Sequence, residues 1–261
     1  MSKRRLSVLG VPVDAMDIVA ALDVAESHIA SGLEPGLVLA VNPEKVYALR
    51  NDPVLQQAFR QARLVLADGI GIALAVRILL GRRISRVTGV DFMHAVCGRA
   101  TQRGYRIFVY GASPEVNHKA VCELRRRYPG IQIVGAADGF SEHSQRGGLV
   151  RRINESQAQI LFVALGSPRQ EHWMIKYAPG LKVQVCQGVG GALDTVAGAV
   201  KRAPWIFRSA GLEWLYRLLR QPSRWRRQVR LAKFAMEVLT TALRQALSRS
   251  RAPINLEGPT A

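Results

Sequence analysis

The chain has 261 residues, of which 48% are hydrophobic, so it can bury a substantial core. Its 37 Lys and Arg against 19 Asp and Glu give a net charge of +18, which indicates an anionic partner: nucleic acid, a membrane surface or a phosphorylated substrate. The three cysteines, Cys97, Cys122 and Cys186, are odd in number and lack CxxC spacing, which argues against a disulfide framework and a zinc site and favours a reducing compartment.

Short apolar runs alternate with helical patterns up to residue 202. The N-terminal segment MSKRRLSVLGVPVDAM lacks an adequate signal-peptide core and is predicted to form a first strand. Six later runs are typical of buried parallel strands, at 37–41, 64–67, 106–111, 131–135, 160–166 and 183–188. Helix starts stand between them, for example Ser113 followed by Pro114 and Glu115. This alternation predicts an α/β fold with a doubly wound, Rossmann-like, mostly parallel sheet, whose ligands bind at the carboxyl ends of the strands.

The pattern changes from about Ala203, where Trp, Leu and Arg recur at helical spacing and strand patterns end. Between Lys201 and Arg251 there are 13 Lys and Arg but only two acidic residues, Glu213 and Glu237. We therefore predict an α/β core at 1–202, a basic, amphipathic helical appendage at 203–251 and a loose terminus at 252–261. No apolar stretch reaches the roughly 20 residues needed to span a bilayer, so any membrane contact is expected to be peripheral.

Asp68 is the first candidate for chemistry. It follows the apolar run 64–67 and precedes Gly-Ile-Gly, so it lies at the carboxyl end of a predicted strand, where a catalytic base would be placed. Asp-Gly is also a common turn pair, so a role as a helix cap or turn residue is an equal alternative. A dinucleotide fingerprint is incomplete, because Leu74 occupies the position of the third glycine after Gly69 and Gly71.

The segment Gly166–Glu171 closes one predicted strand and opens a helix. Ser167 and Gln170 have the spacing of a capping box, which is a purely structural explanation. The functional alternative is that this helix N-terminus faces a phosphate or a sugar, with Arg169 or Gln170 as a donor. The same two interpretations apply to Gly111 and the residues that follow it.

Metal ligands are not indicated by the sequence. No two aspartates are separated by a single residue, so the DxD motif that holds a donor diphosphate through a metal is absent. The five histidines also lack paired ligand spacing. We therefore predict neither a metal nor a cofactor.

An ordered set of short segments covers nearly the whole chain and resembles the WecG/TagA/CpsF glycosyltransferases. The segments are VNPEKV at 41–46, ADGIG at 67–71, RVTGVD at 86–91, the strand that ends in YGAS, LGSPRQE at 165–171, GVGGALD at 188–194 and RAPWIFRSAGLEWLYRLLRQPSRWRRQ at 202–228. Each segment is weak alone, but the series that ends in RAP, GLEWLYRL and PSRWRR is highly specific.

The resemblance implies a metal-independent, inverting enzyme that makes surface polysaccharide or wall polymer. It would move a hexose-type sugar (N-acetylmannosamine, its uronic acid or glucose) from a UDP donor to a polyprenyl-diphosphate-linked sugar. Asp68 falls at the position of the catalytic base. The implied binding positions are Asn42, Arg86, Gly111, Gln170, Gly190, Gly191, Arg217, Arg224 and Arg227. Ala40 departs from the Thr that many members have there, which leaves the donor sugar open.

The chemistry also has a rationale without the resemblance. A hydroxyl nucleophile needs a base, whereas a UDP leaving group needs positive charge, so one carboxylate plus arginines would suffice. The expected partners are the UDP-sugar, the lipid-linked acceptor and an anionic membrane surface. The enzyme is expected on the cytoplasmic face of the plasma membrane, and the sequence leaves open whether it forms a homo-oligomer. The alternatives are a nucleic-acid-binding protein with stacking Trp residues and, less favoured, a nicotinamide-dependent oxidoreductase.

Overall fold

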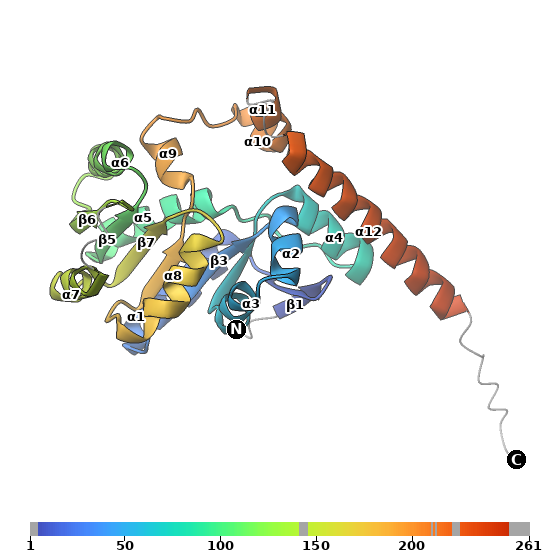
Figure 1. Ribbon diagram of the computed structural model, residues 1–261, viewed down its shortest axis with the longest axis horizontal. Coiled ribbons are helices and arrows are strands. Elements are labelled where there is room, and N and C mark those ends of the chain that lie inside the picture. The colour runs from blue at the N-terminus through green and yellow to red at the C-terminus, as the bar shows by residue number, and fades with distance from the viewer. Residues whose placement is uncertain (1–4, 141–145, 210, 212, 221–224, 251–261) are drawn as a thin grey trace, which may run out of the picture.

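A six-stranded, wholly parallel sheet forms the centre of the molecule. The computed structural model describes residues 5–140, 146–209, 211, 213–220 and 225–250. The strands lie in the order β4-β3-β8-β7-β5-β6 (Figure 1). Their bounds are β3 Gly36–Val41, β4 Leu64–Ala67, β5 Arg106–Gly111, β6 Gln132–Ala137, β7 Ile160–Ala164 and β8 Val185–Gly188. Each matches one of the six predicted runs, and the doubly wound α/β fold is confirmed.

Helices cover both faces of the sheet because side chains alternate along each strand. In β3, Leu37, Leu39 and Val41 point to one apolar core, and Val38 and Ala40 point to the other. The first core is closed by α2 Pro43–Arg50, α3 Pro53–Gln61, α4 Ile70–Leu80, α7 Arg146–Glu155 and α8 Arg169–Tyr177, the last of which continues into the short helix η2 Ala178–Gly180. The second is closed by α1 Ile18–Ser31, α5 Gly89–Arg103, α6 Pro114–Arg127 and α9 Ala192–Val196.

Side-chain caps start five of these helices. The capping oxygens belong to Asp17, Asn42, Asp52, Thr88 and Ser113, and each accepts a hydrogen bond from a backbone N–H in the first turn of α1, α2, α3, α5 and α6 respectively. Proline occupies the first turn of α2, α3 and α6, where its missing N–H costs nothing. The predicted start at Ser113 is therefore confirmed.

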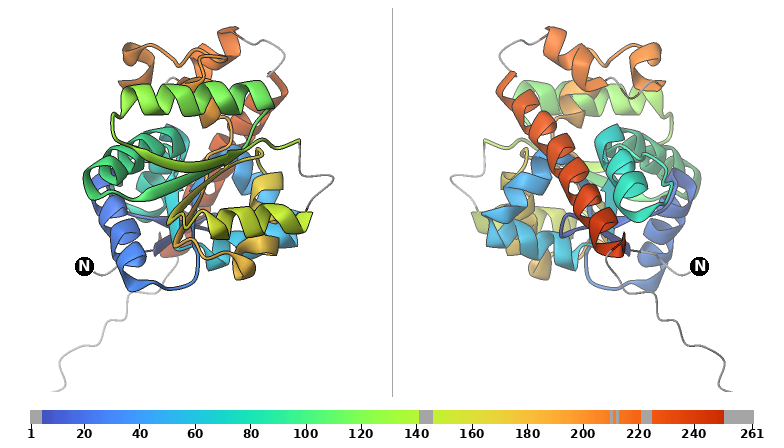
Figure 2. Two further views of the ribbon diagram at one scale, coloured as in Figure 1. Left: turned by 90° about the vertical axis from the view of Figure 1, so that its left-hand side faces the viewer. Right: turned by 90° about the vertical axis from the view of Figure 1, so that its right-hand side faces the viewer.

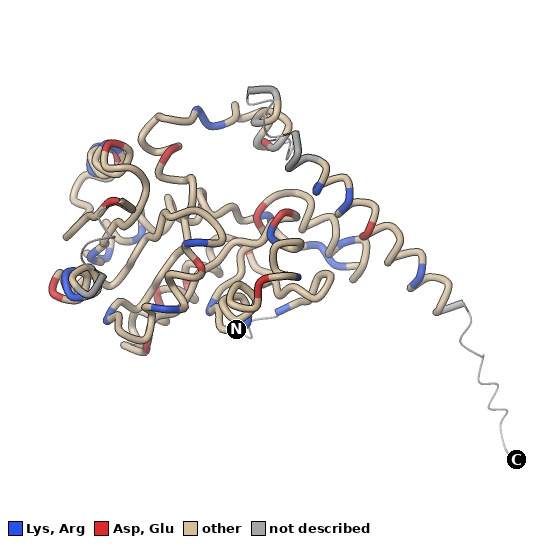
Figure 3. The backbone as a smooth tube through the Cα atoms, viewed as in Figure 1, with Lys and Arg blue, Asp and Glu red and all other residues tan. Residues whose placement is uncertain are grey.

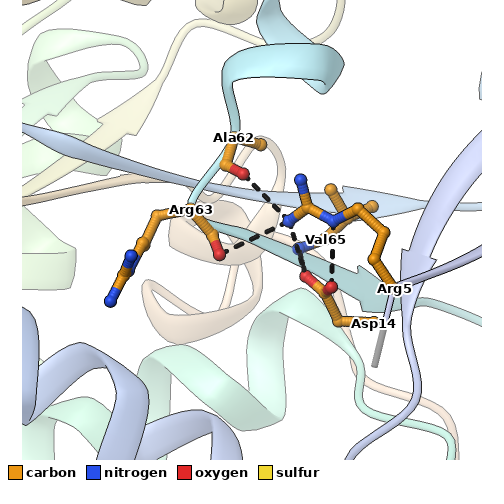
Figure 4. Close-up of polar contacts among 5 residues, drawn as sticks. All are labelled: Arg5, Asp14, Ala62, Arg63 and Val65. Atoms are coloured by element: carbon orange, nitrogen blue, oxygen red, sulfur yellow. Dashed lines mark hydrogen bonds and ion pairs between the residues drawn. The ribbon is translucent and has the colours of Figure 1, made fainter. Parts of the chain in front are cut away.

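The N-terminal segment does not join the main sheet. It forms a separate antiparallel hairpin of β1 Arg5–Val8 and β2 Val11–Asp14, whereas the sequence predicted one strand. The buried Asp14 carboxylate accepts hydrogen bonds from the Arg5 guanidinium, at 2.9 and 3.0 Å, and from the Val65 N–H at 2.8 Å (Figure 4). Arg5 also donates to the carbonyl of Ala62 at 2.9 Å. These bonds fasten the hairpin to the start of β4, the edge strand of the sheet.

The predicted appendage is helical and folds back on the body. It comprises α10 Trp205–Ser209, α11 Glu213–Arg220 and α12 Trp225–Ser250. The long helix α12 packs against α4 and α2 and then extends past them (Figure 2, right, and Figure 1). Phe234 and Val238 are buried in that contact, and Glu237 bonds with Tyr47 and Arg50 of α2. Within the described ranges, no helix is long and apolar enough to cross a membrane.

Candidate active site

The carboxyl ends of β3 and β4 lie next to each other at one edge of the sheet. The N–H of Asp68 bonds to the carbonyl of Val41 at 2.8 Å, and the N–H of Val87 bonds to the carbonyl of Ala67 at 3.0 Å. Asn42 follows Val41, Asp68 follows Ala67 and Arg86 precedes Val87, so these three residues lie side by side. All three are predicted site residues.

Asp68 does not act as the cap of the helix that follows it. The N-cap of α4 is Gly69, with φ 89°, and no side chain caps that helix. Only glycine adopts this backbone conformation without strain, which explains the Gly after Asp68. Since no side-chain hydrogen bond caps α4, the helix-cap alternative is wrong, and the half-buried Asp68 lies at the carboxyl end of β4, where doubly wound folds bind their ligands.

Asn42 and Lys45 connect this edge to a buried ion pair. The Asn42 Oδ1 atom accepts the Lys45 N–H at 3.0 Å, so Asn42 caps α2 with its oxygen and keeps its NH₂ group as a donor. The Lys45 Nζ atom lies 2.7 Å from Oε1 of Glu171, and the two side chains are 12% and 0% exposed. Burial would raise the pKa of the Glu171 carboxyl, but the Lys45 charge and hydrogen bonds from Lys45 and Gln170 hold that pKa below its usual value.

Gln170 is buried and bonded at both ends of its amide. Its Nε2 atom donates to Glu171 Oε1 at 3.1 Å, and its Oε1 atom accepts the Gly190 N–H at 2.9 Å. A Cβ atom on Gly188 would lie 2.7 Å from Gln170 Nε2, so the loop after β8 closes on this amide. The predicted capping box is wrong, because α8 follows Pro168 and has no side-chain cap.

The three predicted site glycines, Gly111, Gly190 and Gly191, have different structural roles. Gly111 has φ 113°, and a Cβ there would lie 2.5 Å from the Ala164 carbonyl oxygen, so close strand packing requires glycine. The Gly190 N–H is occupied by Gln170, whereas Gly191 is exposed at the start of α9. Gly111 is the last residue of β5 and the other two follow β8, so all three lie at the same carboxyl edge as Asp68.

A second polar cluster lies at the start of α5. Asp91 accepts hydrogen bonds from Thr88 at 2.7 Å and from Arg202, which precedes α10. Burial would raise the pKa of the Asp91 carboxyl, but these two bonds and the charges of Arg202 and Arg86 lower it. Asp91 therefore stays ionised and holds positive charge beside the end of β4. In the same helix, burial and the charges of Arg127 and Arg202 lower the pKa of His94 to about 4.

A family model described as the glycosyl transferase WecG/TagA/CpsF family matches residues 6–248. The chain belongs to this family. It is therefore a glycosyltransferase of cell wall or polysaccharide biosynthesis, and it acts on a sugar donor and an acceptor. The resemblance inferred from the ordered segments is confirmed, and a transferase is favoured over the nucleic-acid and oxidoreductase alternatives. The match extends through α10 and α11 and almost to the end of α12, so the appendage belongs to the family's common architecture.

The tail arginines predicted from the family are only partly placed. Arg217 lies in α11 and Arg227 in α12, without described side chains, and Arg224 lies outside the described residues. The junction of α10 and α11 does approach Asp68, because a Cβ atom on Gly211 would lie 2.9 Å from Ile70, the first residue of α4. The start of the appendage therefore reaches the mouth of the site.

Sequence reasoning missed four charged residues at this edge: Lys45, Glu171, Asp91 and Arg202. All four lie inside the segments that carried the resemblance, and a charged residue beside a strand end was the available signal. In the part of the chain that is described, no group of three or more His, Cys, Asp or Glu could hold a metal ion. An open hollow of about 430 Å³ is lined by Asn154 and Lys182, before the starts of β7 and β8, and includes none of the predicted site residues.

Proposed function

We propose that the chain transfers a hexose-type sugar from a UDP donor to a polyprenyl-diphosphate-linked sugar, with inversion and without a metal ion. The observation that carries this proposal is the alignment of Asn42, Asp68 and Arg86, which the backbone hydrogen bonds between β3, β4 and residue 87 bring to one edge. Family membership supports the transfer reaction, and the lack of a DxD pair supports the absence of a metal.

Each group at this edge matches one demand of the reaction. Asp68 takes the proton from the acceptor hydroxyl as its oxygen attacks the anomeric carbon, and the bond from that carbon to the UDP oxygen breaks on the opposite face. The leaving diphosphate gains negative charge in the transition state, which arginines stabilise without donating a proton. Arg86 supplies such charge from the loop after α4, and Arg217, Arg224 and Arg227 supply it from the appendage. The NH₂ group of Asn42 donates to the substrate.

A donor screen tests this proposal. The full chain is incubated with a short-chain polyprenyl-diphosphate-linked sugar and, in turn, UDP-N-acetylmannosamine, its uronic acid and UDP-glucose. We expect UDP release that requires the acceptor, and a product with the anomeric configuration opposite to that of the donor. Release that is the same without acceptor, or retention of configuration, would contradict the proposal.

We also propose that the appendage holds the enzyme on an anionic membrane, where a lipid-linked acceptor presents its diphosphate. Met236, Leu239, Leu243 and Leu247 recur every three or four residues on α12 and are 51–63% exposed, on the side opposite the buried Phe234 and Val238. Trp205 and Ile206 of α10 are also exposed. Lys and Arg also recur along the described part of α12 (Figure 3), and each contributes about 1 kcal/mol near an anionic leaflet.

Point substitutions test the tether better than truncation, because removal of α12 would also expose the α2 and α4 surfaces that Phe234 and Val238 cover. Leu239→Glu with Leu243→Glu should abolish pelleting with anionic vesicles and lower transfer to lipid-linked acceptor, with transfer to a short-chain acceptor preserved. Leu33→Glu is the matched control, because Leu33 is 59% exposed and Leu243 is 63% exposed. If the double variant pellets like Leu33→Glu, α12 is not the tether.

A further inference from the structure

The Lys45–Glu171 ion pair joins three loops at the carboxyl edge of the sheet. Lys45 lies in the first turn of α2, after β3, and its backbone N–H is capped by Asn42. Glu171 lies in the first turn of α8, after β7, beside Gln170. Gln170 in turn accepts the Gly190 N–H from the loop after β8. One connected series of hydrogen bonds therefore runs across the edge that carries Asp68.

Glu171 and the Gly190 N–H both select the same orientation of the Gln170 amide. A carboxylate accepts hydrogen bonds and repels a carbonyl oxygen, so the NH₂ end of the amide faces Glu171. The carbonyl end then faces Gly190 and accepts its N–H. Without the Glu171 carboxylate, the NH₂ end of the amide loses its acceptor, and the Gly190 N–H alone would hold Gln170 in place.

Packing alone does not account for an ionised pair at this position. Taking both charges out of water carries a large desolvation cost, and pairs of this kind can be replaced by apolar residues of similar volume with little loss of stability. Furthermore, the Oε2 atom of Glu171 is buried without a hydrogen-bond partner among the described residues. The bonds from Lys45 and Gln170 both go to the other oxygen, Oε1.

We propose that Lys45 and Glu171 are positioning residues for the transfer reaction, which orient Gln170 and thereby fix the Gly188–Gly191 loop against the α2 turn that carries Asn42. The proposal rests on the proposed function, since it assigns these loops to the substrate site. Neither side chain is required to touch the substrate. A misplacement of about 1 Å in groups that bind the substrate can cost 10²-fold in rate, so a hidden pair can control activity.

Apolar replacement separates positioning from stability. Lys45→Met and Glu171→Met each leave one charge buried without its partner, so each should lower the melting temperature. The double variant removes both charges at similar volume and should recover most of that loss. If the pair positions the site, the double variant transfers sugar about 10²-fold more slowly than the wild type even though its stability is restored. The defect appears as a lower kcat and a higher KM for the donor. Lys45→Arg, which keeps the charge, should retain more activity than Lys45→Met.

An exposed ion pair on α6 provides the matched control. Lys119→Met with Glu115→Met removes this pair and should leave transfer unchanged. A Lys45→Met/Glu171→Met protein that regains both its melting temperature and wild-type transfer would show that the pair is structural and would overturn the proposal.

A measurement without substrate keeps this test independent of the proposed function. Hydrogen exchange at the Gly190 amide should be slow in the wild type and fast in Glu171→Gln and in the double variant, because its acceptor is no longer held in place. Unchanged protection of Gly190 in both variants contradicts the positioning role, whatever the transfer assay gives. Failure of the wild type to transfer any sugar in the donor screen would instead count against the proposed function.

Discussion

Two buried carboxylates, one at each end of the sheet, are bonded very differently. Asp14 lies at the start of β4, and both of its oxygens accept hydrogen bonds, from Arg5 and from the Val65 N–H (Figure 4). Glu171 lies beyond the end of β7, and among the described residues Lys45 and Gln170 both bond to its Oε1 atom, with none bonded to Oε2. Both side chains are 0% exposed, so burial alone does not distinguish them.

The difference in hydrogen bonding indicates a difference in purpose. Asp14 fastens a hairpin to an edge strand that would otherwise present unpaired backbone groups, which is a structural task. Glu171 sits among the loops that bind ligands in doubly wound folds, and its bonds act on the orientation of a neighbouring amide. Changes at the Asp14 end should therefore alter stability, and changes at the other end should alter activity.

The largest expected effect is a loss of transfer at Asp68, which lies at the carboxyl edge of the sheet, called the active edge below. Asp68→Asn should reduce transfer by about 10²- to 10⁴-fold, because the amide cannot accept the proton of the acceptor hydroxyl. The melting temperature and UDP binding should change little. The measurement compares initial rates with those of Asp23→Asn, a substitution on the exposed side of α1. Near-normal turnover in folded Asp68→Asn protein would remove Asp68 from the role of base.

The opposite pattern is expected at Asp14. Asp14→Ala leaves the buried Val65 N–H without its acceptor and Arg5 without its partner, so the free energy of unfolding should fall by about 3 kcal/mol. Urea denaturation measures this loss. Transfer by the protein that remains folded should stay close to wild type. A specific loss of activity at full stability would show that the two ends of the sheet are not separate in function.

A smaller effect is expected from pH, through His94. Its pKa is lowered from 6.5 to about 4, so the folded chain binds fewer protons there than the unfolded chain. The free energy of unfolding should therefore fall as the pH drops through this window. His94→Gln should remove on the order of 1–2 kcal/mol of that fall, allowing for the partial exposure of the ring. His118→Gln, on the exposed side of α6, is the control, and equal slopes in both variants would contradict this assignment.

The smallest expected effect is that of chelation. Transfer with excess EDTA should stay within about two-fold of the rate with Mg²⁺ or Mn²⁺, because arginines rather than a metal ion are proposed to neutralise the leaving diphosphate. Loss of activity that either ion restores would mean that the active edge needs a metal in addition to its cationic side chains.

The sequence by itself determined the class of fold and the family. The six buried strands are continuous apolar runs, and their spacing from capped helices such as α6 is local information that the chain contains in order. The position of Asp68 at a strand end follows from the same pattern. Its alternative role as a helix cap could not be settled, because the choice between Asp68 and Gly69 depends on the backbone at Gly69, where φ is 89°.

Only the tertiary structure decided which charges meet. Lys45 and Glu171 are 126 residues apart, and Asp91 and Arg202 are 111 apart, so no local pattern predicts either pair. The N-terminal run forms a hairpin rather than one strand because Leu9 and Gly10, with φ of 50° and 82°, turn the chain between β1 and β2, and Asp14 then binds the start of β4. Likewise, the apolar spacing of α12 indicates two faces, but its packing on α2 and α4 determines which one is buried and which remains exposed.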